Sequence, residues 1–384
     1  MYKIKNLLFL FSGMLSMISN SLSGQIELSD SAEISVITCR PGDDVYNIFG
    51  HTAIKISDPL FGKNEFYNYG IFDFRTPNFT MKFLRGKLLY QLGIGSSRAF
   101  MEEYNYSKRS VFEQVLDLNT QEKNNLYNAL RLNYRPENRA YLYDFFFDNC
   151  STRPRDLLIE NIEGLSFPPE DIEKISYRNL LDQFTYSRPW LDFGIDLIIG
   201  SIADKNAGML NQMFLPEYLY KHLAKATKEN KPLVKSAAIV IDYENQLEKR
   251  SKITLFTPML LFLILLLLEL ILFQKFYRAT SPNHVSLYDK IWFLILGIGS
   301  LVLSFMWWGT DHIATKLNLN LLWMHPLFLV LVFKVQRSFF IITAILMLLA
   351  LVISPFIQEI HVASIIIIII SILKILRCIG NKSS

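Results

Sequence analysis

Two residues of this sequence have types and settings that suit nucleophilic catalysis, Cys150 and His51. Cys150 follows Asn149 and stands shortly before Pro154, which opens an apolar segment with the pattern of a helix. Amide N–H groups and the positive end of the helix dipole gather at a helix start, and both favour a thiolate over a thiol. His51 opens a segment that alternates with period two and is predicted to be a strand. We therefore interpret Cys150 as a candidate nucleophile and His51 as its general base.

Pro154 indicates where the helix after Cys150 should begin. Proline is favoured at the first helical position and the residue before it avoids helical geometry, so the helix is expected to start near Arg153. Cys150 is then predicted to stand on a tight turn in front of the helix, with Ser151 and Thr152 as candidate caps. The alternative is a buried and inert cysteine, which is common for this residue type.

The segment after the His51 strand is expected to return as the second strand of a hairpin. Turn residues occupy 58–64, and an aromatic run follows at 65–70. A polar side chain from this run would lie beside His51 and fix the tautomer of its imidazole, as the third member of a catalytic triad does. The sequence leaves several candidates open for this role: Tyr67, Asn68 and Tyr69, with Asn68 or Tyr69 preferred.

The composition separates a soluble part from a membrane part. The chain has 384 residues and a net charge of +4, which is too small and too dispersed to argue for nucleic acid as a partner. The sequence contains neither a phosphate-binding loop nor a spacing typical of metal ligands, so no metal and no other cofactor is expected. Apolar residues are concentrated in the last third, which predicts a membrane domain there.

The N-terminus has the layout of a signal peptide. Lys3 and Lys5 precede an apolar run over 7–18, and small residues extend to Gly24. Residues 1–24 are therefore predicted to be a signal peptide, with an uncleaved anchor as the alternative. Export would also permit a disulfide between Cys39 and Cys150, which is the alternative to a free thiol at Cys150.

Residues 25–250 are predicted to form an exported α+β domain. Strands are expected at 33–38 and 111–118, and Asn119 with Glu122 resembles the capping pair of a helix that follows. The apolar segment 190–199 could lie on a membrane surface, although a core helix is favoured. Other segments are assigned by their pattern: helices at 81–92, 171–184 and 214–226, and a charged connector at 228–250.

Residues 251–384 are predicted to form an all-α transmembrane domain of about five helices. Lys and Arg are concentrated in the loops that should be cytoplasmic if the N-terminal domain is exported, as the positive-inside rule requires. The third segment is short for a full span. The five apolar segments are 253–273, 291–308, 321–333, 338–356 and 362–376.

The outer loop between the second and third segments combines tryptophans with polar residues. Trp307 and Trp308 suit the membrane interface. Tryptophan is common there in membrane proteins, so these two residues by themselves do not indicate a binding site. Polar residues at the same depth are costly there unless they have a function or a partner. They are interpreted as a site for a lipid head group or a lipidated substrate: Asp311, His312, Asn318 and Asn320.

Several motifs together resemble the Lnb family of exported-domain-plus-membrane proteins, known as lipoprotein N-acyltransferases in Bacteroides-type bacteria. A histidine that precedes an Asn-Cys pair also resembles the circularly permuted papain-like (NlpC-type) fold of the lecithin:retinol acyltransferase group. The likeness covers nearly the whole mature chain. The segments that carry it are 39–44, 49–54, 67–74, 146–156 and 318–323.

The resemblance implies a specific reaction and location. Cys150, deprotonated by His51, would take an acyl chain from a membrane phospholipid as a thioester and pass it to the α-amine of a diacylated lipoprotein. Asn149 and Arg153 would take part in substrate binding beside the cysteine. The protein would be a multi-pass protein of the inner membrane with its N-terminal domain in the periplasm.

Two other classes of function fit parts of the sequence. A membrane-anchored cysteine peptidase or amidase, acting on cell wall or protein, could use the same Cys150 and His51, although one anchor would suffice for it. A non-catalytic lipoprotein-binding factor would give Cys150 a structural role.

Overall fold

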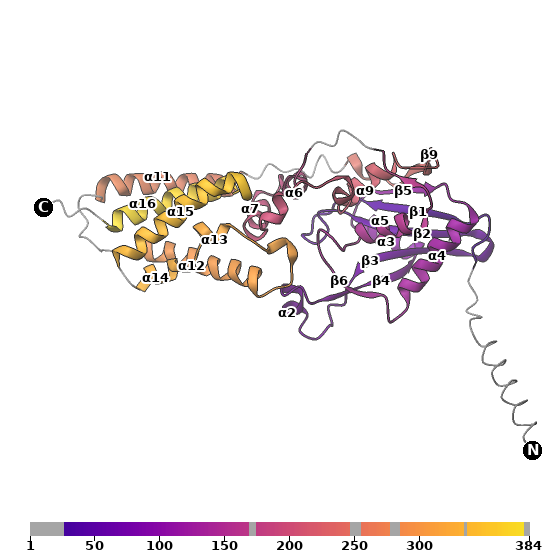
Figure 1. Ribbon diagram of the computed structural model, residues 1–384, viewed down its shortest axis with the longest axis horizontal. Coiled ribbons are helices and arrows are strands. Elements are labelled where there is room, and N and C mark those ends of the chain that lie inside the picture. The colour runs from indigo at the N-terminus through magenta and orange to yellow at the C-terminus, as the bar shows by residue number, and fades with distance from the viewer. Residues whose placement is uncertain (1–26, 169–173, 246–254, 277–284, 334–335, 380–384) are drawn as a thin grey trace, which may run out of the picture.

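The computed structural model describes residues 27–168, 174–245, 255–276, 285–333 and 336–379. A sheet-rich part lies at one end of the molecule and a group of long helices at the other (Figure 1). The chain is thus a sheet-rich α+β domain followed by an all-α domain, as the sequence predicted. The predicted signal peptide and the predicted boundary at residues 250–251 lie outside the described residues.

A seven-stranded sheet in the order β10-β5-β1-β2-β3-β4-β6 forms the centre of the N-terminal domain. Every neighbouring pair in it is antiparallel. Consecutive strands β1, β2, β3 and β4 therefore lie side by side as hairpin partners. The strands are β1 Glu33–Cys39, β2 His51–Asp58, β3 Lys63–Ile71, β4 Leu89–Ser96, β5 Val111–Leu116, β6 Ala140–Leu142 and β10 Val234–Ile241.

Four of these strands match the sequence predictions, and two segments do not. The helix predicted over 81–92 is wrong, because helix α2 covers only Phe79–Leu84 and β4 begins at Leu89. Gly86 between them has φ +67°, a left-handed conformation that ends the helix. The connector predicted over 228–250 contains β10, whose partner β5 is distant in sequence.

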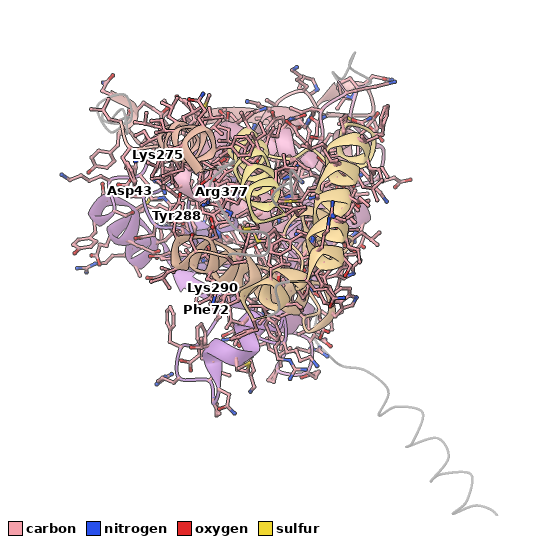
Figure 2. The ribbon with its side chains drawn as sticks, turned by 90° about the vertical axis from the view of Figure 1, so that its left-hand side faces the viewer. Asp43, Phe72, Lys275, Tyr288, Lys290 and Arg377 are labelled. Atoms are coloured by element: carbon pink, nitrogen blue, oxygen red, sulfur yellow. The ribbon has the colours of Figure 1, made fainter. Side chains whose placement is uncertain are left out.

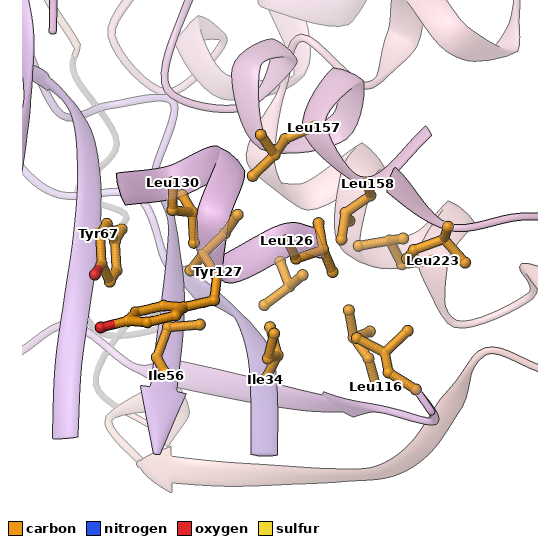
Figure 3. Close-up of a cluster of buried hydrophobic side chains, with 14 of the residues drawn as sticks. Ile34, Ile56, Tyr67, Leu116, Leu126, Tyr127, Leu130, Leu157, Leu158 and Leu223 are labelled. Carbon is orange, nitrogen blue, oxygen red and sulfur yellow. The ribbon is translucent and has the colours of Figure 1, made fainter. Parts of the chain in front are cut away.

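The main core lies between one face of the sheet and helices α4 (Thr120–Tyr134) and α5 (Thr152–Asn161). Alternation along the strands turns every second residue of β1 and β2 toward these helices. The capping box predicted for α4 is present, with Asn119 and Glu122 bonding each other's backbone N–H groups. Figure 3 shows the side chains that meet in this core, among them Ile34, Ile56, Leu126, Leu130, Leu157 and Leu158.

The opposite face of the sheet carries a smaller core under helix α3 (Ser97–Tyr106). Ile37 and Cys39 of β1 and Ala53 of β2 pack there against Phe100. Cys39 is opposite His51 in the β1–β2 register, so both lie at the end of the sheet where β2 begins.

Short helices connect the sheet to the membrane domain. Helix α7 inserts Phe193 into the membrane-domain core, and the indole of Trp190 donates a hydrogen bond to the Phe256 carbonyl at 2.9 Å. Segment 190–199 therefore contains a helix that packs in a core, which is the interpretation that its sequence favoured over a helix on the membrane surface. The connecting elements are α6 Tyr177–Thr185, α7 Pro189–Ile198, η2 Ser201–Asp204, α8 Met209–Gln212 and α9 Pro216–Leu223.

The described part of the membrane domain has four helices that are long and apolar enough to cross a bilayer. The third predicted segment is instead two short helices, α13 and α14, separated around Pro326, which lacks the N–H that a continuous helix would use. The helices are α11 Pro258–Phe276, α12 Leu287–Trp308, α13 Asn320–Trp323, α14 Leu327–Phe333, α15 Arg337–Ile357 and α16 Val362–Ile379.

Four buried charged residues join α11, α12 and α16 near the end of the bundle far from the sheet. The Lys374 ammonium lies 2.8 Å from Glu269 and 3.2 Å from Asp289. Arg377 pairs with the same two carboxylates. Figure 2 faces this end of the bundle and labels Arg377 and Tyr288, whose ring lies under the Lys374 ammonium at 3.4 Å. Two acids and two bases compensate each other, which buried charges in a membrane require.

The two loops predicted to lie outside the membrane contact the connecting helices. The Gly200 N–H donates to the Ala314 carbonyl at 2.8 Å, and the Glu359 N–H donates to Asp204 at 3.0 Å. A Cβ on Gly200 would lie 1.8 Å from the Lys316 carbonyl oxygen, so only glycine allows this approach. These two loops of the membrane domain are therefore in direct contact with the connecting helices of the N-terminal domain.

Candidate active site

Cys150 stands on the turn in front of α5, as predicted. The helix begins at Thr152, one residue before the predicted start, and Pro154 occupies its third position. Ser151 makes no side-chain cap in the structure. The cap comes from Asn149, whose Oδ1 accepts from the N–H groups of Ser151 at 2.7 Å and Thr152 at 2.9 Å. In return, the Thr152 hydroxyl oxygen accepts a hydrogen bond from the Asn149 N–H at 2.7 Å. The two residues therefore stabilise the turn through reciprocal hydrogen bonds.

The remaining polar atoms of Asn149 are also occupied. Its Nδ2 donates to the carbonyls of Phe145 at 2.8 Å and Phe214 at 2.9 Å, and the side chain is buried. We therefore assign Asn149 to shaping the cysteine turn, in place of the substrate contact expected from the sequence.

The sulfur of Cys150 lies where the β2–β3 ladder opens. The backbone ladder between these strands begins at Ala53 opposite Asn68 and does not extend to His51 and Thr52. The Thr52 hydroxyl lies 3.5 Å from the Ser151 hydroxyl there, and the Thr52 backbone N–H lowers the pKa of the Cys150 thiol. On the β3 side, a Cβ placed on Gly70 would lie 3.7 Å from the Cys150 Cβ. The open end of the hairpin thus receives the cysteine turn next to Thr52, the residue that follows His51.

His51 meets Asn68 and not Tyr69. The imidazole Nε2 lies 3.2 Å from Asn68 Oδ1, and an amide oxygen can only accept, so Nε2 carries the proton. The lone pair is then on Nδ1, which can take a proton from a thiol. The Tyr69 hydroxyl accepts from Asn133 at 2.9 Å instead, because alternation turns Tyr69 to the other face of the sheet.

Burial keeps both reactive groups neutral near pH 7. It lowers the pKa of His51 to about 4, against the smaller raising effect of Asn68. It raises the pKa of the Cys150 thiol to about 11, although the N–H groups of Thr52 and of Cys150 itself lower it. The helix start therefore does not produce a standing thiolate, which the sequence had suggested. The arrangement suits a thiol that loses its proton to His51 only as it attacks.

We expect the alkylation of Cys150 by iodoacetamide to accelerate about tenfold per pH unit between about pH 7 and about pH 10. The reason is that the thiolate fraction of a group with a pKa of about 11 rises in that proportion over this range. Stopped reactions analysed by peptide mass spectrometry would measure the rate, with Cys150→Ser as the background control. A rate already level at pH 7 would show a thiolate–imidazolium pair instead.

The Arg153 guanidinium contacts two neighbouring side chains. Its guanidinium binds Asp148 through two hydrogen bonds of 2.5 and 2.8 Å and lies 3.5 Å from the centre of the Tyr141 ring. We assign Arg153 to positioning Tyr141, whereas the sequence suggested a substrate contact.

Three residues of the site were missed by the sequence reasoning: Thr52, Tyr141 and Tyr143. The Tyr141 side chain is 7% exposed, and its hydroxyl finds no hydrogen-bond partner among the described residues. Tyr143 lies 3.9 Å from a Cβ placed on Gly70, and burial raises its pKa well above the usual value. The aromatic run that precedes Cys150 in the sequence could have indicated the two tyrosines, since large side chains next to a turn tend to pack around it.

The outer-loop residues fall into two groups. Asn318 donates to the Leu197 and Ile198 carbonyls at 2.7 and 3.0 Å, and Asn320 donates to the Asp196 carbonyl at 2.9 Å. Both asparagines are buried, and we assign them to tying the end of α7 to the membrane domain, in place of a head-group contact.

Asp311 and His312 form the second group and lie against α2. The Asp311 N–H donates to the Arg85 carbonyl at 2.9 Å, and His312 Nε2 lies 3.1 Å from the Phe83 carbonyl oxygen. The Asp311 carboxylate lies 3.8 Å from the Lys87 ammonium, and its side chain is 57% exposed, so it remains accessible from solvent.

One group of side chains in the described chain has the types that could hold a metal ion. Ligand atoms of Asp192, Asp196 and His361 all lie within 4.8 Å of one another. Arg178 already contacts Asp196 at 2.6 Å, and His361 lies 3.6 Å from Asp192. The Asp196 carboxylate of this cluster is therefore already engaged by an arginine.

Two family models match the chain one after the other. A model of the Lnb N-terminal periplasmic domain matches residues 25–183, which include His51, Asn68 and Cys150. A model of the Lnb transmembrane domain matches residues 248–382. Searches among curated proteins and among solved structures gave no match.

Proposed function

Because the chain belongs to the Lnb family, we propose that it is a lipoprotein N-acyltransferase that moves an acyl chain from a membrane phospholipid to the α-amine of a diacylglyceryl-cysteine lipoprotein. The observation that supports this most is that the Cys150 turn approaches β2 one residue after His51, where the Thr52 and Ser151 hydroxyl oxygens lie 3.5 Å apart, while His51 Nε2 meets Asn68. A neutral thiol beside a neutral imidazole is suited to acyl transfer, in which proton and acyl group move together.

The first half-reaction would form a thioester on Cys150. As the sulfur attacks the ester carbonyl, His51 Nδ1 takes the thiol proton, and Asn68 stabilises the resulting imidazolium through Nε2. Collapse of the tetrahedral intermediate breaks the ester C–O bond, and His51 returns the proton to the departing lysophospholipid oxygen. The sulfur is left bound to the acyl carbon.

Hydrogen-bond donors around the sulfur would hold the oxyanion of the intermediate. The backbone N–H groups of Thr52 and Cys150 lower the pKa of the Cys150 thiol, and donors that stabilise a thiolate would also stabilise the oxyanion. The hydroxyl of Tyr141 is a third donor, because it is buried without a partner among the described residues and lies close enough for its pKa to respond to Cys150.

The second half-reaction would transfer the acyl group to the lipoprotein. The free α-amine attacks the thioester, and His51 accepts a proton from the nitrogen as the N–C bond forms. The C–S bond then breaks, and the imidazolium gives that proton to the Cys150 sulfur. A thioester in water would hydrolyse, so the Tyr141, Tyr143 and Tyr90 rings serve to limit the access of water.

The proposed location follows from the same family and from the topology. We propose a signal peptide at 1–24, a periplasmic domain at 25–250 and a multi-pass domain at 251–384 in the inner membrane. Lys and Arg in the opposite loops and the contact of both outer loops with α7 and η2 support this orientation.

The test is a trapped intermediate. Purified protein incubated with phosphatidylethanolamine vesicles, with lipoprotein withheld, is expected to gain the mass of one acyl chain on the Cys150 peptide, and hydroxylamine should remove it. Addition of a diacylated lipopeptide should discharge the adduct and add the same mass to the peptide amine. Release of free fatty acid without amine acylation would favour a hydrolase, and the absence of any adduct under turnover conditions would contradict the two-step scheme.

A further inference from the structure

Helix α2 and the loop before it expose an unusual amount of apolar surface. Phe74 is 72% exposed, Met81 54% and Phe83 48%, and α2 has no buried residue. Lys82 and Arg85 stand among these apolar residues. Apolar side chains interleaved with basic ones are typical of a segment that lies in the head-group region of an anionic bilayer.

The contacts of α2 place it at the level where the bilayer should end. The candidate span α12 finishes at Trp308, and Asp311 and His312, a few residues later, hydrogen-bond the carbonyls of Arg85 and Phe83. A Cβ on Gly86 would lie 3.2 Å from the His312 nitrogen, so the two backbones touch. Figure 1 shows α2 projecting from the sheet beside the neighbouring end of α12. Helix α2 therefore lies at the level of the end of this candidate span.

Ring contacts continue from α2 toward the cysteine. The Phe83 and Phe79 ring centroids are 6.2 Å apart, and Phe79 lies 5.8 Å from Phe72. The next contact, from Phe72 to Tyr90, measures 5.2 Å, and Tyr90 lies 4.6 Å from Tyr143. Tyr143 borders the Gly70 position, as Cys150 does.

We propose that residues 71–90 form a lipid-collecting arm, in which α2 sits in the outward-facing leaflet and its ring series guides one phospholipid acyl chain from the bilayer to Cys150. The inference rests on the proposed function only in naming Cys150 as the acceptor of that chain. The basic residues of α2 would meet the phosphate, while the rings offer the chain an apolar path that water does not fill.

The depth of the arm can be measured without any catalysis. A nitroxide is attached at Met81→Cys in the Cys150→Ser full-length protein, whose two other cysteines are each 1% exposed, and the protein is reconstituted in phosphatidylethanolamine–phosphatidylglycerol vesicles. Phe61→Cys is the matched control, because Phe61 is 58% exposed in the β2–β3 turn at the far end of the hairpin. Oxygen concentrates in the bilayer and a nickel chelate stays in water, so the ratio of their relaxation effects reports the depth of the nitroxide. We expect this oxygen-to-nickel ratio to be several-fold higher for the label at residue 81 than for the label at residue 61. Equal ratios at residues 81 and 61 would contradict the proposal that α2 sits in the bilayer.

A second experiment tests delivery of the chain. Phe74→Ser with Met81→Ser is expected to slow acylation of Cys150 by vesicle phosphatidylethanolamine at least about tenfold. Acylation by soluble p-nitrophenyl butyrate should change less than about twofold, since that donor needs no bilayer, and Phe61→Ser should affect neither. Equal loss with both donors, or no loss with either, would overturn the arm. A wild-type protein that accepts an acyl chain from neither donor would contradict the proposed function. The depth of the nitroxide at residue 81 would then still show whether α2 lies in the bilayer.

Discussion

Replacing Cys150 by alanine is expected to lower lipoprotein N-acylation at least about 10⁴-fold, because the thiol that carries the acyl chain in the proposed mechanism is removed. Cys150→Ser should be nearly as inactive, since a serine hydroxyl is a far weaker acid than a thiol and His51 has a pKa of only about 4. The readout is the mass of a lipopeptide N-terminus in cells or vesicles that contain only the variant.

Two cysteines provide matched controls for this prediction. Cys39 and Cys378 are free and buried, one under α3 and one in the membrane domain, so Cys39→Ala and Cys378→Ala should keep most of the activity. All three cysteines are unpaired, which also shows that the Cys39–Cys150 disulfide is not formed. Unchanged N-acylation by Cys150→Ala would make Cys150 structural and support a lipoprotein-binding factor.

Replacing His51 by alanine is expected to reduce kcat/KM for thioester formation about 10³- to 10⁴-fold, because the thiol of Cys150 would have no base in reach. In the wild type, burial lowers the pKa of His51 to about 4, so the imidazole stays neutral down to that pH. Activity should therefore persist in mildly acidic buffer and fall as the pH approaches about 4, where His51 becomes protonated. A rate unchanged in His51→Ala would remove this residue from the mechanism.

Asn68 supplies the control that separates positioning from folding. Asn68→Ala should lower the rate about 10- to 100-fold, less than His51→Ala, because the base remains but loses its fixed tautomer. Asn68→Asp should raise the pKa of His51 through its carboxylate and move the acidic limb of the pH profile upward. A variant that merely misfolds would lose activity without shifting that limb.

Local patterns in the sequence determined much of the fold. Period-two alternation located β1, β2 and β5, and the Asn119–Glu122 pair located the start of α4, because each depends on residues a few positions apart. Pro154 likewise placed Cys150 on a turn in front of a helix, since its ring constrains only its neighbours. Hydropathy found the membrane helices for the same reason.

The tertiary structure alone decided what surrounds the candidate nucleophile. Strand register selected Asn68 over Tyr69, and α5 packing brought Cys150 to the open end of β2. Burial then reversed the expected ionisation, because desolvation depends on every atom nearby and outweighs the local effect of a helix start. β10, the ties from Asn318 to α7, and the place of α2 beside the end of α12 are likewise contacts between distant segments. Residue types and spacing therefore predicted which groups could react, whereas long-range packing set their burial and their partners.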